Sequence, residues 1–335
     1  MTRTDMSRTI RIVCSVATCA LAAYLLSLVG CSRSPDPWGE GKDKSLKVLV
    51  SFPPLYCFTK GVAGEEARVV SLLAPTGPHE HQANADDAQL AAGADLFLAN
   101  GLGLDDFVGR VVTNSGNTKV KTIKIAEIAL PEKARLPLGK HDDEHGHEGH
   151  DHKHTGEWDP HAWLGVDQAI LMVQQIAKTL KEADAANAST YDARAAKYVQ
   201  KLQELQNYGK QKLAGKTNRK LIAMHESLGY FCKSFELELI DSIMPRPGIE
   251  ADLPKLAELQ EVCRQKDVRL IAVEPQYPSN TGARLLLDEL RRQGVPDAAF
   301  VEIDPMETAD LADLTPDYYE RTTRANVETL AKALK

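Results

Sequence analysis

Several signatures of common protein classes are missing from this sequence. No long run of Lys or Arg is present and the formal net charge is −7, which argues against a nucleic-acid partner because phosphate binding needs a basic surface. There is no CxxC pair, HExxH motif or GxSxG motif, the usual marks of a redox pair, a zinc protease and a serine hydrolase. Hydrophobic residues make up 43% and charged residues 26% of the 335 residues. This balance excludes a mostly disordered chain and a multi-span membrane protein, and the length predicts about two globular domains.

The first thirty residues have the pattern of an export signal. A segment with three Arg precedes an uncharged apolar stretch that ends at Leu28-Val29-Gly30-Cys31. This ending resembles the lipobox of bacterial lipoproteins, so it predicts a signal peptide over 1–30, lipid on Cys31 and a membrane-anchored tether over 31–44. The alternative is an uncleaved anchor helix, because the apolar stretch is nearly long enough to span a bilayer. Both interpretations place the rest of the chain outside the cytoplasm.

Cysteine usage fits an exported chain. Two of the six cysteines would leave with the signal peptide and Cys31 would carry lipid, which leaves Cys57, Cys232 and Cys263. An odd number in an oxidising compartment allows at most one internal disulfide. A Cys232–Cys263 disulfide is one hypothesis, and three buried, reduced thiols are the other.

Short apolar runs alternate with helical patterns along the mature chain. We predict strands over 46–50, 69–73, 96–99, 220–223, 268–273 and 300–303, and helices over 54–63, 87–92, 253–265, 281–293 and 317–334. Between the two series, apolar stripes with helical spacing run from Val166 to Leu180 and from Tyr191 to Leu205. Strand–helix alternation is typical of parallel sheets. The expected fold is therefore two α/β lobes, 45–185 and 215–335, each with a mostly parallel sheet flanked by helices. A long bridging helix over 186–214 would join them, with a cleft between the lobes.

The histidines are unevenly placed. Six of the ten lie in the loop 138–156, which is rich in acid and Gly: His141, His145, His147, His150, His152 and His154. The stretch His141–His154 has no apolar side chain, so we expect either weak, exchanging auxiliary metal sites or a purely solvated linker. Outside the loop, His79, His161 and His225 stand at turn signals, and two of them follow predicted strands. Three imidazoles from separate segments would make a metal site if they converged, which spacing alone does not establish.

A family resemblance gives these histidines a role. It rests on motifs spread over nearly the whole mature chain: Pro78-His79, Asp87, Ala94-Asp95-Leu96, Asn100-Gly101, Asp159-Pro160-His161-Ala162-Trp163-Leu164, His225-Glu226-Ser227-Leu228-Gly229-Tyr230-Phe231 and Val273-Glu274-Pro275-Gln276. Together they resemble the metal-specific substrate-binding lipoproteins of bacterial ABC importers, the zinc/manganese family. The resemblance implies that His79, His161 and His225 bind a metal between the lobes. It also implies zinc over manganese, because manganese members carry Glu at the place of His225 and usually lack a His-rich loop.

The fourth ligand is open at this point. Many relatives supply an Asp from the loop after Glu274, and this loop has none. Glu274 is our choice, with Glu80, His81 or a water as alternatives, and Glu274 could instead orient a ligand from behind. Asp159 is interpreted as such an orienting or structural residue.

The resulting functional hypothesis is capture rather than catalysis. The chain would bind Zn²⁺ as a monomer and deliver it to a membrane permease driven by a cytoplasmic ATPase. One alternative is a manganese- or iron-specific member of the same family. Others are an extracytoplasmic zinc hydrolase with Glu226 as its base, and a zinc buffer or adhesin without a transporter.

Overall fold

The computed structural model describes Trp38 and residues 45–138, 158–244, 247–277 and 281–335. Contacts divide the chain into two compact units, Met1–Lys42 and Asp43–Lys335. The predicted signal peptide, Cys31 and the six loop histidines lie outside the described residues, as does the tether apart from Trp38. Within the described ranges, no helix combines the length and apolar character needed to cross a membrane.

The first half of the second unit is built on a parallel sheet. Its strands are β1 (Leu46–Val50), β2 (Ala67–Ser71), β3 (Leu96–Ala99) and β4 (Lys121–Lys124), in the order β2-β1-β3-β4. Its helices are α2 (Pro53–Ala63), α3 (Ala85–Ala92), α4 (Val108–Ser115) and α5 (Ile125–Ala129). The central strand β3 is buried throughout, because helices cover both faces of a parallel sheet and its inner strands are therefore apolar runs.

The second half repeats the same strand order. Its strands are β5 (Lys220–Ala223), β6 (Glu238–Ser242), β7 (Leu270–Val273) and β8 (Ala299–Glu302), in the order β6-β5-β7-β8, all parallel. Its helices are α8 (Gly229–Ser234), α9 (Leu253–Lys266), α10 (Thr281–Arg292) and α11 (Tyr318–Ala333). In each sheet the strand order reverses beside the first strand, and ligands of such sheets bind at the carboxyl ends of the strands near this point.

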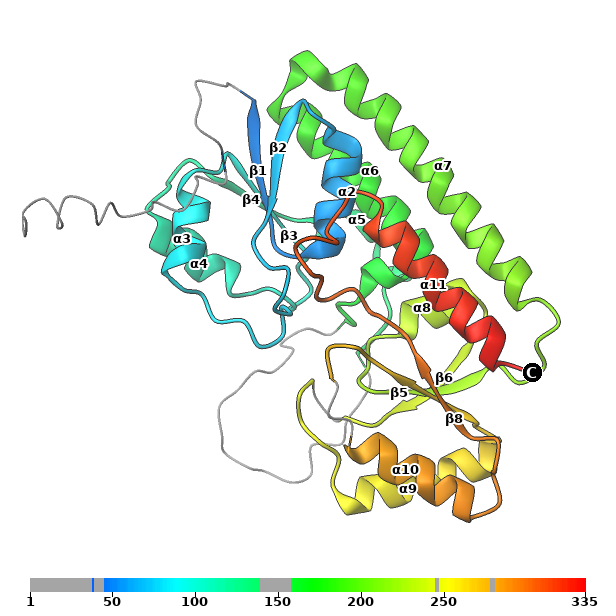
Figure 1. The fold of residues 1–335 in the computed structure, drawn as a ribbon. Helices are drawn as coiled ribbons and strands as arrows, with labels where there is room; N and C mark the ends of the chain where they lie inside the picture. Colours follow the sequence, from blue (N-terminus) through cyan, green and yellow to red (C-terminus); the bar gives the residue numbers. More distant parts are fainter. Residues whose placement is uncertain (1–37, 39–44, 139–157, 245–246, 278–280) are drawn as a thin grey trace, which may run out of the picture. The chain divides into compact units, whose positions relative to one another are not determined.

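Two long helices connect the halves, α6 (Val166–Ala183) and α7 (Ala188–Leu213). With 26 residues, α7 is roughly 39 Å long at about 1.5 Å per residue. It packs against α2, α6 and the C-terminal helix α11, which lies beside it and runs in the same direction (Figure 1). The prediction of two parallel α/β lobes joined by a long helix is confirmed, whereas the boundaries at 185 and 215 stay predictions.

The elements that were not predicted are short or at sheet edges. Strand β4 reads Lys-Thr-Ile-Lys and is mostly exposed, so it has no apolar run to reveal it. The predicted strand 69–73 begins two residues earlier, as β2. The four inner strands, β1, β3, β5 and β7, all lie within predicted strands.

The disulfide hypothesis is wrong. Cys57, Cys232 and Cys263 are all buried free thiols. Burial raises the pKa of each of them to about 12, so they stay protonated and act as small apolar side chains.

Candidate metal centre

His79 comes from the segment between β2 and α3. The end of this segment is fixed at the start of α3, where Asn84 caps the helix and the Asp87 carboxylate accepts a bond from the Asn84 backbone N–H at 2.9 Å. The same oxygen of Asp87, Oδ2, also lies 2.7 Å from Nε2 of His81. His81 therefore helps to hold the segment, and His79 is the histidine that reaches the site.

His161 lies in a short segment that several hydrogen bonds fix. Asp159 Oδ1 accepts from the His161 backbone N–H at 2.9 Å and lies 2.7 Å from the His161 Nδ1. The carbonyl of Pro160 accepts from Asn100 Nδ2 at 3.0 Å, and Asn100 follows β3 at the carboxyl edge of the first sheet. Trp163 Nε1 donates to the Pro305 carbonyl at 2.8 Å, which ties this segment to the loop after β8.

A glycine supports the turn that carries Asn100. Gly101 has φ +83°, a left-handed conformation that favours glycine. Its N–H donates to Asp105 Oδ1 at 2.9 Å. A Cβ at this position would lie 2.8 Å from Cγ of Glu127. The Asn-Gly pair of the motif is thus required for backbone geometry that supports the His161 segment from behind.

His225 is presented by the second sheet. It follows β5, and its Nδ1 lies 2.9 Å from Oε1 of Glu274, which follows the neighbouring strand β7. Both residues are buried, with exposed fractions of 1% and 2%. Parallel strands end at the same edge of the sheet, so the pairing of β5 with β7 places the carboxylate behind the imidazole.

Glu307 is presented by a strained turn after β8. Met306 has φ +62°, an uncommon conformation for a residue with a side chain, and its N–H donates to Asp304 Oδ1 at 2.7 Å. Asn326 on α11 clasps the same turn. Its Oδ1 accepts from the Asp304 N–H at 3.0 Å and its Nδ2 donates to the Asp304 carbonyl at 2.8 Å. Such strain is commonly kept where a functional side chain must be aimed.

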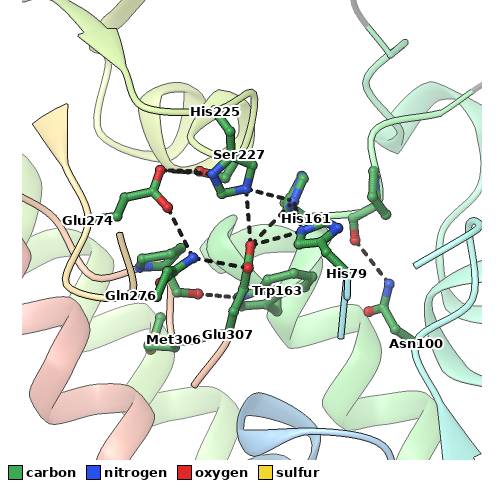
Figure 2. A network of polar contacts seen from close by, with 12 residues as sticks. His79, Asn100, His161, Trp163, His225, Ser227, Glu274, Gln276, Met306 and Glu307 are labelled. Atoms are coloured by element: carbon green, nitrogen blue, oxygen red, sulfur yellow. Dashed lines mark hydrogen bonds and ion pairs between the residues drawn. The ribbon is translucent and has the colours of Figure 1, made fainter. Parts of the chain in front are cut away.

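The four side chains meet at one point (Figure 2). Oε1 of Glu307 lies 3.2, 3.5 and 3.1 Å from Nε2 of His79, His161 and His225, in that order. Nε2 of His161 lies 3.2 Å from that of His79 and 3.4 Å from that of His225. All four atoms lie within 4.8 Å of one another. A tetrahedral zinc ion with bonds of about 2.0–2.1 Å separates its ligand atoms by about 3.3–3.4 Å, and the five separations of 3.1–3.5 Å given above fit that ion.

The lone pairs of these nitrogen and oxygen atoms also favour a bound cation. Asp159 and Glu274 accept from Nδ1 of His161 and His225, which leaves the Nε2 atoms of the neutral rings with outward lone pairs. These two nitrogens and Oε1 of Glu307 lie 3.1–3.5 Å from one another. At this distance their lone pairs repel one another unless a proton or a metal ion lies among them. The site is therefore built to hold positive charge.

The pKa directions express the same electrostatics. Burial opposes ionisation of Glu307, yet the surrounding histidines hold the pKa of its carboxyl well below its usual range. Burial also opposes protonation of the imidazoles, but contacting carboxylates raise the pKa of His225 well above its ordinary value and raise that of His161. For His79 burial prevails and lowers the pKa.

The structure brings together the three histidines chosen from the sequence and differs on the fourth position. Glu274 lies behind His225 and outside the converging group, whereas Glu307 lies inside it. Glu307 has no motif around it, and the only signal for it was its place in the loop after a predicted strand. Asp159 has the orienting contact that was expected of it.

The fold and the site together define a class: a two-lobed α/β protein with a candidate metal centre built from both lobes. Residues 48–333 match the family described as zinc-uptake complex component A, periplasmic, and the chain belongs to that family.

Relatives and solved structures agree with this membership. Over 253 residues the chain is 31% identical to the zinc-binding lipoprotein AdcA of Streptococcus pneumoniae, covering 74% of this chain and 48% of that protein. Over 300 residues it is 26% identical to the zinc-binding protein AdcA of Streptococcus pyogenes, covering 87% and 56%. The chain thus spans about half the length of these relatives. The zinc-bound structure of an AdcAII variant from Streptococcus pneumoniae superimposes with a TM-score of 0.72 at 26% identity, covering 87% of this chain and 99% of that one.

Proposed function

We propose that this chain is the extracytoplasmic zinc-binding component of an ABC importer. It binds one Zn²⁺ through Nε2 of His79, His161 and His225 and Oε1 of Glu307. The observation that carries the proposal is the convergence of these four atoms at tetrahedral ligand spacing. Zinc is the cargo, which the protein passes to a membrane permease driven by a cytoplasmic ATPase.

The donor set favours zinc over manganese. Imidazole suits zinc and other late transition metals, whereas manganese prefers oxygen ligands in octahedral geometry. Here three of the four converging atoms are imidazole nitrogens. The names of the AdcA relatives support the same metal.

Capture rather than catalysis follows from the number of ligands. A catalytic zinc keeps one position open for water, with three protein ligands. In this site four protein atoms fill the tetrahedral positions, and Glu307 occupies the place that a reactive water would need. The chain would act as a monomer, be anchored by lipid on Cys31, and collect zinc through the weak auxiliary sites of the 138–156 loop.

A metal-loaded crystal structure tests this assignment. We expect a single strong anomalous peak at the zinc absorption edge, with the four named atoms at bonding distance. Soaking with manganese at the same concentration should give a weaker site. A zinc peak elsewhere among the described residues, or a water in place of Glu307, would contradict the proposal.

A further inference from the structure

The two oxygens of the Glu307 carboxylate have different partners. Oε1 faces the imidazoles, whereas Oε2 accepts a hydrogen bond from Nε2 of Gln276 at 3.0 Å. The same amide nitrogen donates to Oε2 of Glu274 at 3.0 Å. Glu274 in turn holds Nδ1 of His225. One side chain therefore contacts both a candidate ligand and the residue that orients another ligand (Figure 2).

The orientation of the amide follows from chemistry. Both partners are carboxylate oxygens, which only accept hydrogen bonds, and an amide nitrogen offers two N–H donors. If the amide were turned over, its oxygen would face the two carboxylate oxygens and be repelled by them. Gln276 is partly buried, so these two bonds are shielded from competing water.

We propose that Gln276 is a specificity-determining positioning residue, which selects zinc by keeping Glu307 monodentate. This rests on the proposed zinc-binding function. Because Oε2 is held by the amide, only Oε1 is offered to the ion, and the site supplies one oxygen and three nitrogens. That number suits four-coordinate zinc.

Manganese gains less from such a site. It favours six ligands and prefers oxygen, and the second oxygen of a bidentate carboxylate would supply a further ligand. To offer Oε2, Glu307 must break its bond to Gln276. The amide therefore penalises the higher-coordinate ion, and its removal should lower this penalty while loosening the site for zinc.

The test compares the mature chain with its Gln276→Leu variant in competition titrations against a chromophoric chelator, once with Zn²⁺ and once with Mn²⁺. Loss of a residue that supports ligands in this way lowers metal affinity about 10- to 100-fold. We expect such a loss for Zn²⁺ and a smaller one for Mn²⁺, so the Zn/Mn affinity ratio falls about tenfold. Co²⁺ is the spectroscopic probe, and its intense visible bands in a four-coordinate site should weaken in the variant as the coordination number rises.

Controls separate the possible failures. Gln200→Leu removes an exposed glutamine on α7 that also donates to a glutamate, at 2.9 Å, and should leave both affinities unchanged. Gln276→Met keeps the unbranched side chain, and the same fall in the ratio is expected if the Leu variant does not fold. Equal weakening of both metals with an unchanged Co²⁺ spectrum, or no change at all, would overturn the role of Gln276. If the unmodified chain itself binds no zinc, the proposed function fails instead.

Discussion

Substitution of Glu274 by Gln is the sharpest probe of how the site is tuned. Oε1 of Glu274 accepts from Nδ1 of His225 at 2.9 Å, and its Oε2 accepts from Nε2 of Gln276 at 3.0 Å. Both of these partners are N–H donors. A glutamine at position 274 has only one acceptor atom, its amide oxygen, so it satisfies only one of the two partners. If Gln276 turned over to adapt, its oxygen would face Oε2 of Glu307. One favourable contact is therefore lost in every arrangement.

The expected magnitude follows from this loss. Removing a carboxylate that orients a metal-binding imidazole costs about 10- to 100-fold in affinity, which is about 1.4–2.7 kcal/mol at about 1.36 kcal/mol per tenfold. We expect this decrease for Zn²⁺ in chelator competition at pH 7.5. Glu302→Gln changes an exposed residue at the end of β8 and should bind zinc as the unmodified chain does.

The pH dependence of zinc affinity distinguishes an effect of Glu274 on His225 from a general loosening of the fold. Contacting carboxylates, Glu274 first among them, raise the pKa of His225 well above its ordinary value against the effect of burial. Zinc needs the neutral ring, so protons compete with the metal at pH values above the ordinary histidine pKa of about 6.5. Without the Glu274 charge this competition weakens, so the affinity gap between the two proteins should narrow as the pH falls. Unchanged affinity at pH 7.5, or a gap that widens on acidification, would refute the reasoning.

Three further predictions concern a ligand of the site, the His-rich loop and the packing of α7. His225→Ala should abolish tight zinc binding in calorimetry, and wild-type affinity in this variant would contradict its place as a ligand. Deletion of 141–154 should remove only weak binding events, and loss of the tight event as well would make the loop a primary ligand source. Gly209→Ala places a methyl group against the buried ring of Phe235; we expect a loss of about 1–3 kcal/mol in the free energy of unfolding by urea titration, and an unchanged midpoint would show that the ring moves freely.

Most of the sheet architecture could be predicted because buried parallel strands are continuous apolar runs. The bounds of β1, β3 and β5 were predicted to the residue. The edge strands β4 and β6 were not predicted, because their exposed or half-exposed positions do not need apolar side chains. Their presence depends on pairing with a neighbour far along the chain, which a local pattern does not encode.

The candidate site divides in the same way. His79, His161 and His225 stand beside turn residues and within motifs, so their importance could be inferred, although their convergence could not. Glu307 has no turn signal or motif beside it. Its position depends on the left-handed conformation of Met306 and on the hydrogen bonds from Asn326 of α11, which the local sequence does not reveal. Glu274 was chosen because many relatives have a ligand in the loop that follows it, but its position at the end of β7 makes it a support for His225.

The clasp of Asn326 on the turn before Glu307 has a consequence for biogenesis. The turn that carries this carboxylate gains both of these hydrogen bonds to Asp304 only when the last helix, α11, has docked. A nascent or C-terminally clipped polypeptide would possess every imidazole yet lack the anchored oxygen. Under the proposed function, tight zinc binding would therefore depend on completion of the chain.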